Sequence, residues 1–319
     1  MTRIVCALLF CALLLGVPVR AQAQSCSATA SAINFGSVSP IRGNTVNATG
    51  TINVTCTWPL ISLTPNVLVC LNLSAATPLA LTNSGNSLRY GLFQDSGHSV
   101  PWGSTYNGTT PIALTLVKPL LGTFASQSVT IYGQIAGSQQ TVPTVGNSST
   151  AYSQVFSGTQ TSLNYVFFLL GAPGCASLPS EGTFAFTTSA TVVNDCTINT
   201  TNVAFATSSL LNAALNATGS LTVQCTNNDA YRIALNGGGS GNPASRQMQR
   251  VGGGGAVSYQ LYVDAGHTVA WGDGTGGTSM AAGIGSGLRQ VIAVYGVVPA
   301  QTTPAAGNYS DTITATIYF

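Results

Sequence analysis

Apolar and polar residues alternate along residues 182–196, which read GTFAFTTSATVVNDC. Phe184, Phe186, Ala190 and Val192 fall on one side of this segment, and most of its hydroxyl-bearing residues fall on the other. A period of two is typical of a β-strand with one buried face. We therefore predict a strand at residues 183–193, which follows the first of two similar segments and closes it.

The chain repeats itself once, and the repeat predicts its domains. Cys56 and Cys225 are separated by the same number of residues as Trp102 and Trp271. We expect an N-terminal domain at residues 24–193 and a C-terminal domain at residues 194–319. The matching segments are NATGTINVTC (47–56) with NATGSLTVQC (216–225), SLRYGLFQDSGHSVPWG (87–103) with AVSYQLYVDAGHTVAWG (256–272), residues 129–135 with 291–298, and residues 146–156 with 307–319.

Both copies consist of short segments rich in Val, Ile, Thr and Tyr, separated by clusters of Gly, Pro or Asn. Such segments are typical of strands and turns, and no amphipathic helical pattern of useful length interrupts them. The expected fold class is all-β, with two tandem Ig-like antiparallel β-sandwiches.

The last strand of the second copy is expected to have an open apolar edge. Its inward-facing residues would be Ile313, Ala315, Ile317 and Phe319, and no later segment pairs with them. An open apolar edge promotes aggregation unless another strand covers it, and that strand can come from another chain. The alternative is that residues 312–319 form the ordinary last strand of a complete domain.

The first residues predict export. Arg3, an apolar run and the small-residue site at residues 21–23 are typical of a cleaved targeting segment at residues 1–23. Charged residues make up only 5% of the chain. Without Arg3 and Arg20, positive and negative charges balance, which argues against nucleic acid or an anionic membrane as a partner.

Six cysteines follow the targeting segment, and an even number in an exported chain predicts disulfides. Cys26 and Cys56 have nearly the same spacing as Cys196 and Cys225, so we pair each couple within its own domain. The remaining two, Cys70 and Cys175, have no counterpart in the second copy and are expected to pair with each other.

Three apolar loops are expected at the end of domain one that is remote from domain two, because antiparallel strands alternate in direction. Their equivalents in the second copy are polar or rich in glycine. The candidate surface-binding residues are Trp58, Leu60, Ile61 and Leu63 in the first loop, Leu120, Leu121 and Phe124 in the second, and Tyr165, Phe167, Phe168, Leu169 and Leu170 in the third. The alternative is that these residues belong to the core, or that residues 165–170 form a strand, since an apolar run does not report its own burial.

Other residue groups do not favour catalysis. Asp95 with His98, and Asp264 with His267, recur in both copies and indicate tight turns. The mature chain contains a single glutamate, Glu181, and no nucleophile or metal motif. The glycine-rich residues 237–255 are expected to form a flexible surface loop. We expect no enzyme activity, no cofactor and no metal.

The repeated motifs also carry a resemblance. The NATGxxxVxC opening, the DxGHxxxWG centre and the closing GNYSDTITATIYF resemble the spore coat protein U domain family. This resemblance implies a subunit of an archaic chaperone–usher pilus. It also implies a periplasmic chaperone, an outer-membrane usher and a neighbouring subunit that donates a strand as partners. Two such domains, with Cys26 close to the expected cleavage site, resemble the tip adhesin, which is displayed at the cell surface and grips apolar abiotic or host surfaces during biofilm formation.

Two further interpretations stay open at this point. The protein could be a structural coat or shaft subunit without a ligand. It could also be a lectin-like tip in which Trp58 and Tyr165 stack on sugar rings. An enzyme is the least favoured interpretation.

Overall fold

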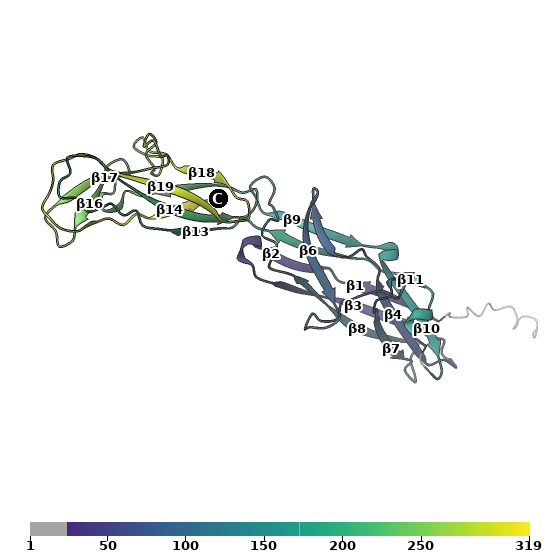
Figure 1. Cartoon of the computed structure of the whole chain (residues 1–319). Helices are drawn as coiled ribbons and strands as arrows, with labels where there is room; N and C mark the ends of the chain where they lie inside the picture. Colours follow the sequence, from purple (N-terminus) through teal and green to yellow (C-terminus); the bar gives the residue numbers. More distant parts are fainter. Residues whose placement is uncertain (1–23, 172) are drawn as a thin grey trace, which may run out of the picture.

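The computed structural model describes residues 24–171 and 173–319, so the predicted targeting segment at residues 1–23 lies outside the described residues. Two β domains lie end to end, and the C-terminus lies near the joint between them (Figure 1). Within the described residues no helix has the length and apolar character needed to cross a membrane. The helical elements are the short 3-10 turns η1 (Pro40–Arg42), η2 (Thr105–Asn107), η3 (Gly158–Gln160), η4 (Cys175–Ser177) and η5 (Gly238–Ser240).

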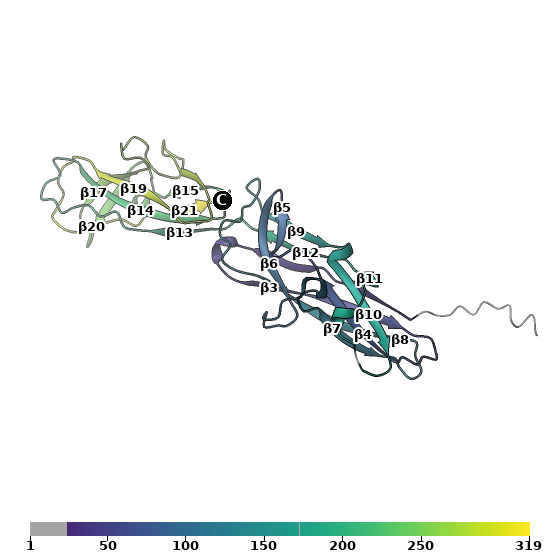
Figure 2. The same cartoon turned by 45° about the vertical axis from the view of Figure 1, so that its right-hand side comes forward.

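The N-terminal domain is a sandwich of a large and a small sheet. The large sheet has the order β1 (Ser25–Ala30), β3 (Val46–Thr57), β8 (Phe124–Ile135), β6 (Asn86–Phe93), β5 (Leu79–Asn83), β9 (Thr150–Phe156), β12 (Phe186–Val192) and β2 (Ile33–Val38). The small sheet has the order β11 (Gly182–Thr183), β10 (Thr161–Phe168), β4 (Asn66–Leu73) and β7 (Ile112–Val117). Figure 2 shows β12 among the strands of this domain.

The C-terminal domain repeats this arrangement with fewer paired strands. Its larger sheet has the order β13 (Cys196–Thr200), β14 (Leu215–Cys225), β19 (Gln290–Val298), β17 (Ala256–Tyr262), β16 (Arg246–Arg250) and β20 (Tyr309–Ser310). Its smaller sheet has the order β18 (Ala281–Ile284), β15 (Ala230–Leu235) and β21 (Ala315–Tyr318).

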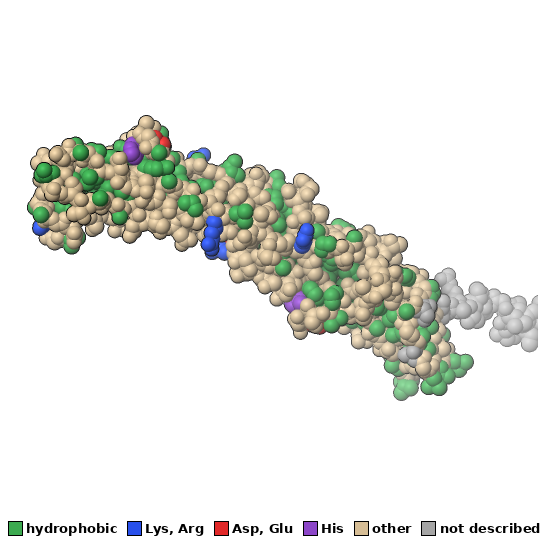
Figure 3. Space-filling view, in the orientation of Figure 1, with side chains coloured by type: hydrophobic (Ala, Val, Ile, Leu, Met, Phe, Trp, Pro, Cys, Tyr) green, Lys and Arg blue, Asp and Glu red, His purple; other side chains and the backbone are tan. Residues whose placement is uncertain are grey.

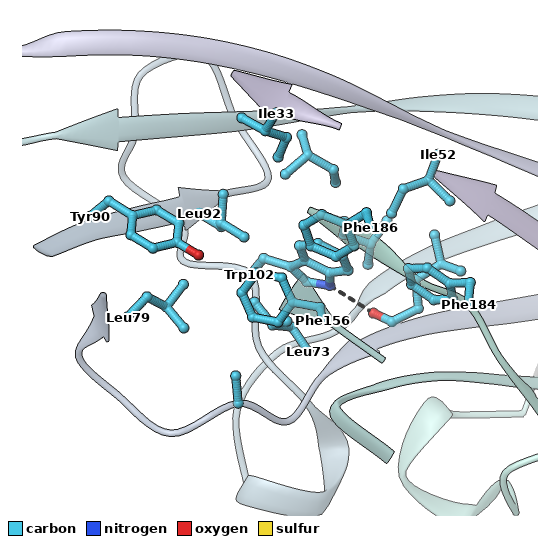
Figure 4. Close-up of a cluster of buried hydrophobic side chains, with 14 of the residues drawn as sticks. Ile33, Ile52, Leu73, Leu79, Tyr90, Leu92, Trp102, Phe156, Phe184 and Phe186 are labelled. Atoms are coloured by element: carbon cyan, nitrogen blue, oxygen red, sulfur yellow. Dashed lines mark hydrogen bonds between the residues drawn. The ribbon is translucent and has the colours of Figure 1, made fainter. Parts of the chain in front are cut away.

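Equivalent tryptophans anchor the two cores. Trp102 and Trp271 are buried, and each indole nitrogen donates to a backbone carbonyl, at 3.0 Å to Leu71 and at 2.9 Å to Ile233. Figure 4 shows Trp102 packed beside Phe184 and Phe186. The matching bonds place equivalent residues of the repeat at equivalent positions in both domains.

Three disulfides join the cysteines in the expected pairs. Cys26–Cys56 and Cys196–Cys225 each connect the first strand of a domain to its neighbour in the sheet, β1 to β3 and β13 to β14. Cys70–Cys175 joins the small sheet of the N-terminal domain to η4. The last bridge therefore exists in one domain only.

Two expectations about local structure are wrong. Residues 165–168, expected in an apolar loop with a strand as the alternative, belong to β10, which pairs with β4 along its whole length, so the alternative is correct there. The glycine-rich residues 237–255 include β16 and the wholly buried Arg246. The Arg246 guanidinium donates to the carbonyl oxygens of Leu235 and Asn236, which fixes the segment, and burial lowers its pKa.

Side chains and loops join the two domains. Arg42 forms an ion pair with Asp195, with Nε 2.5 Å from Oδ2, and Ser39 donates to the same carboxylate at 2.7 Å. Burial would raise the pKa of Asp195, but the hydrogen bonds from Arg42 and Ser39 and the Arg42 charge hold it below its usual value. Thr144 donates to Asp229, whose pKa is raised by burial.

Candidate functional site

The apolar loops predicted for the N-terminal domain meet at one end of it. In the ladders, Thr57 lies opposite Phe124, and Asn66 lies opposite both Val117 and Phe168. The loops after β3, after β7 and after β10 therefore emerge side by side. Figure 3 shows green side chains gathered at this end of the molecule, away from the C-terminal domain.

Eight large apolar side chains of these loops are exposed to between 56% and 98%. We call them the apolar tip: Leu60, Ile61, Leu63, Leu120, Leu121, Phe124, Leu169 and Leu170. Phe124 is the first residue of β8, so it lies at a strand end rather than within the loop as expected. Contiguous exposed apolar surface on a soluble domain usually marks an interaction site.

Trp58 is not part of this surface, and the prediction that it is exposed is wrong. Its side chain is 0% exposed, its indole nitrogen donates to the carbonyl of Thr64 at 3.0 Å, and its ring meets Phe167 edge-on at 5.4 Å. The first loop wraps around the indole because the ring fills the end of the core while its N–H is satisfied within the loop. Trp58 therefore supports the first loop of the apolar tip from the core side.

Three aromatic residues of the third segment are half-buried. Tyr165 and Phe167 lie on β10 and pack against the core, and Phe168 ends the strand. The following residues, Leu169 and Leu170, leave the sheet and are exposed. Of the third predicted loop, the structure therefore assigns only these two leucines fully to the tip.

Contacts between the loops hold the tip together. The backbone N–H of Trp58 donates to the carbonyl of Thr123 at 2.7 Å, which joins the first loop to the second. Asn66 donates to the carbonyl of Leu169 at 3.1 Å, which joins the start of β4 to the third. Sequence reasoning missed these bonds because they link residues that are distant along the chain.

A long groove is the second candidate site, and it lies in the C-terminal domain. Its volume is about 930 Å³. Residues 200–209 form one wall, residues 303–311 form the other, and the floor includes Leu221, Leu261 and Val294. Among the described residues, residues 203–208 have no ladder partner.

The equivalent position in the N-terminal domain is filled by β12. This strand pairs antiparallel with β9 and parallel with β2, so it lies between them. Its inward residues are all buried, namely Phe186, Thr188, Ala190 and Val192. The sequence INFGSV of β2 corresponds to residues 203–208, VAFATS, which line the open groove.

Strand registers locate the equivalent wall residues. Ser153 lies opposite Thr82 on β5, and Ser310 lies opposite Gln249 on β16, which is the counterpart of Thr82. Ser310 thus corresponds to Ser153, Asp311 to Gln154 and Ile313 to Phe156, so the expected match of residues 146–156 ends at residue 313 and does not extend to residue 319. By the same reasoning β21 corresponds to β10, since each pairs with the strand that follows the domain's second cysteine.

The expected open edge is therefore displaced along the chain. Ile313 and Ala315 line the groove, whereas Ile317 and Phe319 are outside its lining. Ile317 packs against the core of the domain, and Phe319 is half exposed at the end of the chain beyond β21. The wall that faces the groove is the segment around β20, because there the chain passes from the larger sheet to the smaller one.

The paired Asp and His residues form tight turns, as expected. His98 and His267 have left-handed backbone conformations, with φ of 54° and 55°. In each turn the aspartate accepts hydrogen bonds from residues four and five positions later. The backbone bonds from Val269 and Thr268 lower the pKa of Asp264 to about 2. Within the described residues no cluster of His, Cys, Asp or Glu is suited to a metal ion.

A solved structure shares the fold. A chaperone–tip adhesion subunit pre-assembly complex, CsuC–CsuE, from archaic chaperone-usher Csu pili of Acinetobacter baumannii matches with a TM-score of 0.53 and 18% identity, over 92% of this chain and 100% of that chain. A chaperone–tip adhesin complex of CFA/I fimbriae matches over 90% of this chain and 95% of that chain at 10% identity, with a TM-score of only 0.31.

Sequence comparison gives the family. Protein U of Myxococcus xanthus is 38% identical over 117 residues, which are 35% of this chain, and the chain spans 64% of that relative's length. The profile of the Spore Coat Protein U domain matches residues 14–153 and residues 182–316. These two matches cover most of the chain, and they confirm the resemblance drawn from the repeated motifs. The chain therefore belongs to the Spore Coat Protein U domain family.

Proposed function

We propose that this protein is the tip adhesin subunit of an archaic chaperone–usher pilus. The observation that carries the proposal is the asymmetry of the two domains. One has an exposed apolar tip and is completed by its own β12, and the other has an open groove between residues 203–208 and β20. A subunit with this asymmetry can accept a strand at one end only and leaves the other end free for a surface.

In this function the groove of the C-terminal domain accepts an extended strand from another protein. A periplasmic chaperone occupies the groove first, the outer-membrane usher receives the complex, and the next pilus subunit then supplies the lasting strand. Addition of a strand to an open sheet edge is a general mode of recognition, in which the backbone supplies affinity and the alternate side chains supply specificity. The chain would thus be exported and displayed at the cell surface.

The apolar tip binds apolar abiotic or host surfaces and so supports attachment and biofilm formation. The loops that carry it, residues 58–65, 118–123 and 169–181, contain two charged residues, Lys118 and Glu181. Burial of about 300 Å² of apolar surface contributes roughly 7 kcal/mol before the cost of ordering the loops. Several leucines that reach the surface together therefore suffice for adhesion without a specific pocket.

The test is attachment to polystyrene by bacteria that carry the full pilus. Substitution of Ile61, Leu121 and Leu170 by Ser, one in each loop, should reduce attachment at least about tenfold, because each change removes exposed apolar area. A matched control replaces Val251, Val269 and Val291 by Ser, since these are exposed apolar residues of the C-terminal domain.

The control variant should attach like the parent, and both variants should be secreted in equal amounts. Unchanged attachment of the tip variant would refute the proposed role of the loops. Attachment that free sugars inhibit would favour a lectin-like tip instead, although the burial of Trp58 removes one of the two aromatic platforms expected for sugars.

A further inference from the structure

The strand that completes the N-terminal domain carries one buried hydroxyl among its inward residues. Thr188 is 0% exposed, and its Oγ1 lies 2.7 Å from the hydroxyl oxygen of Tyr90. The Tyr90 hydroxyl also donates to Oε1 of Gln154 at 2.7 Å. Figure 4 shows the Tyr90 hydroxyl directed into the apolar core, between Leu79 and Leu92.

The direction of these bonds follows from the groups involved. A phenol hydroxyl has one proton, and Tyr90 gives that proton to the Gln154 side chain. The hydroxyl of Thr188 is then the donor to the Tyr90 oxygen at 2.7 Å, with the carbonyl oxygen of Gln154 as a more distant acceptor at 3.4 Å. The completing strand therefore supplies a hydrogen bond to the core as well as apolar area.

The C-terminal domain has an equivalent tyrosine, but no completing strand among the described residues supplies a hydroxyl donor to it. Tyr259 is the counterpart of Tyr90 in the repeat, is buried to the same degree and lines the open groove. Its hydroxyl donates to Oδ2 of Asp311 at 2.7 Å, and Asp311 is the counterpart of Gln154. The phenol is the donor in this bond, and the carboxylate oxygen accepts.

Asp311 is also held in place on its other side. Its Oδ1 accepts the backbone N–H groups of Gly239 and Thr312, each at 2.8 Å. The Asp311 carboxylate thus finds its hydrogen-bond partners within the domain. The phenol oxygen of Tyr259 donates its proton to Asp311 and can still accept a hydrogen bond. In the N-terminal domain the completing strand reaches this oxygen.

We infer that the strand that fills this groove carries a serine or threonine opposite Tyr259, which donates a hydrogen bond to the phenol oxygen. The inference rests on the proposed function, in which the groove accepts a strand, and it adds which side chain that strand carries opposite Tyr259. By analogy with β12, the inward residues of the partner are a large apolar residue, the hydroxyl residue, a small residue and an apolar residue.

The position of the large apolar residue, which corresponds to Phe186, also has identifiable neighbours. Phe186 stacks on Phe156 with ring centroids 4.6 Å apart. The counterpart of Phe156 is Ile313, which lines the groove. Because isoleucine is smaller than phenylalanine, the C-terminal groove has room for a large aromatic or aliphatic side chain here. The hydroxyl two residues later then faces Tyr259.

The probe for this inference is a peptide copied from the chain itself. A fluorescent peptide with the sequence of residues 183–193, flanked by lysines for solubility, is titrated with the full chain, and binding is measured by anisotropy. The test peptide carries Thr188→Val, which keeps the shape and removes the donor. The matched control carries Thr187→Val, because Thr187 faces away from the core in β12 and should not affect binding.

The parent and Thr187→Val peptides should bind equally, and the Thr188→Val peptide should bind about fivefold more weakly, as expected for one buried hydrogen bond. With the Tyr259→Phe chain the difference between the parent and Thr188→Val peptides should disappear, because the acceptor is gone. This second comparison also places the bound peptide in the C-terminal groove.

Equal or tighter binding of the Thr188→Val peptide to the unmodified chain would overturn the inference and leave strand acceptance intact. A difference that persists in the Tyr259→Phe chain would overturn it as well. Failure of every peptide to bind would contradict strand acceptance itself, and the inference with it.

Discussion

The two domains share one sequence pattern, but the N-terminal domain contains a completing strand, β12, that has no counterpart among the described residues of the C-terminal domain. Ile33 and Phe35 are buried in the N-terminal domain on β2, which pairs with β12. Their counterparts in the repeat, Val203 and Phe205, are half-buried and line the open groove. The same type of residue at the same place is thus core in one domain and wall of a groove in the other. Burial at these positions is decided by the neighbouring strand.

The loops at the equivalent end of each domain also differ, and here the N-terminal domain is the one with the exposed apolar surface. In the N-terminal domain they are apolar and free, and they form the apolar tip. In the C-terminal domain the equivalent loops are polar and contact the other domain. Asn227 donates to the carbonyl of Thr141 at 2.7 Å, and the N–H of Thr144 donates to the carbonyl of Asn227 at 3.1 Å. One end of the fold thus serves as a joint in one copy and as a surface in the other.

The largest expected effect comes from making the two domains alike. A copy of residues 184–193 joined after Phe319 through a flexible linker should fill the groove and raise the unfolding midpoint of the C-terminal domain by about 10 °C or more. The cause is burial of inward side chains that match those of β12. Differential scanning calorimetry would measure the shift.

The control for this fusion carries Asp at the copied positions of Phe186 and Val192. It should leave the midpoint unchanged, because charged side chains cannot enter an apolar groove. Equal midpoints for the fusion and the control would show that the groove does not accept the strand that completes its twin.

A second comparison uses equivalent residues of the two walls. Phe156→Ala should destabilise the N-terminal domain by about 3–5 kcal/mol, because a wholly buried ring is lost. Ile313→Ala should cost the C-terminal domain only about 1 kcal/mol, because its side chain is half-buried beside the groove. Denaturant unfolding would give both values.

In the fused chain Ile313→Ala should become more costly, since the added strand would bury its side chain. A large cost of Ile313→Ala in the unfused chain would indicate that the groove is already closed in solution.

The smallest effect concerns the joint. The pKa of Asp195 is held below its usual value, so its ion pair with Arg42 stabilises the folded chain above the usual carboxyl range. This stabilisation is lost as the pH falls through the lowered pKa. Arg42→Met should therefore lower the unfolding midpoint slightly at pH 7 and have no effect in strong acid.

The control is Arg89→Met, because Arg89 has no ion pair among the described residues. Asp229, whose pKa is raised, is present in the parent and in both variants, so its opposite dependence on pH cancels in the difference. A midpoint difference for Arg42→Met that persists in strong acid, below the lowered pKa of Asp195, would mean that the ion pair is not its cause.

Sequence reasoning found the parts of the fold that depend on local pattern. The alternation at residues 183–193 located β12, although this strand begins only at Phe186 because Gly182–Thr183 pair with β10 in the small sheet. The cysteine spacing within each repeat indicated the observed pairs. It failed where a residue's surroundings come from distant segments. Trp58 and Leu60 lie two residues apart in one apolar loop, yet the first is 0% and the second 71% exposed.

The sequence by itself determined the duplication, the all-β class and the strand that completes the N-terminal domain, because these follow from periodicity and from self-similarity. The tertiary structure alone decided which apolar residues form the apolar tip and which segments of the C-terminal domain form the walls of the open groove. It also placed Asp311 and Tyr259 in contact, although the two residues lie 52 positions apart in the sequence. The physical reason is that burial and hydrogen bonding depend on strand register across the sheets, which a local pattern of apolar residues does not specify.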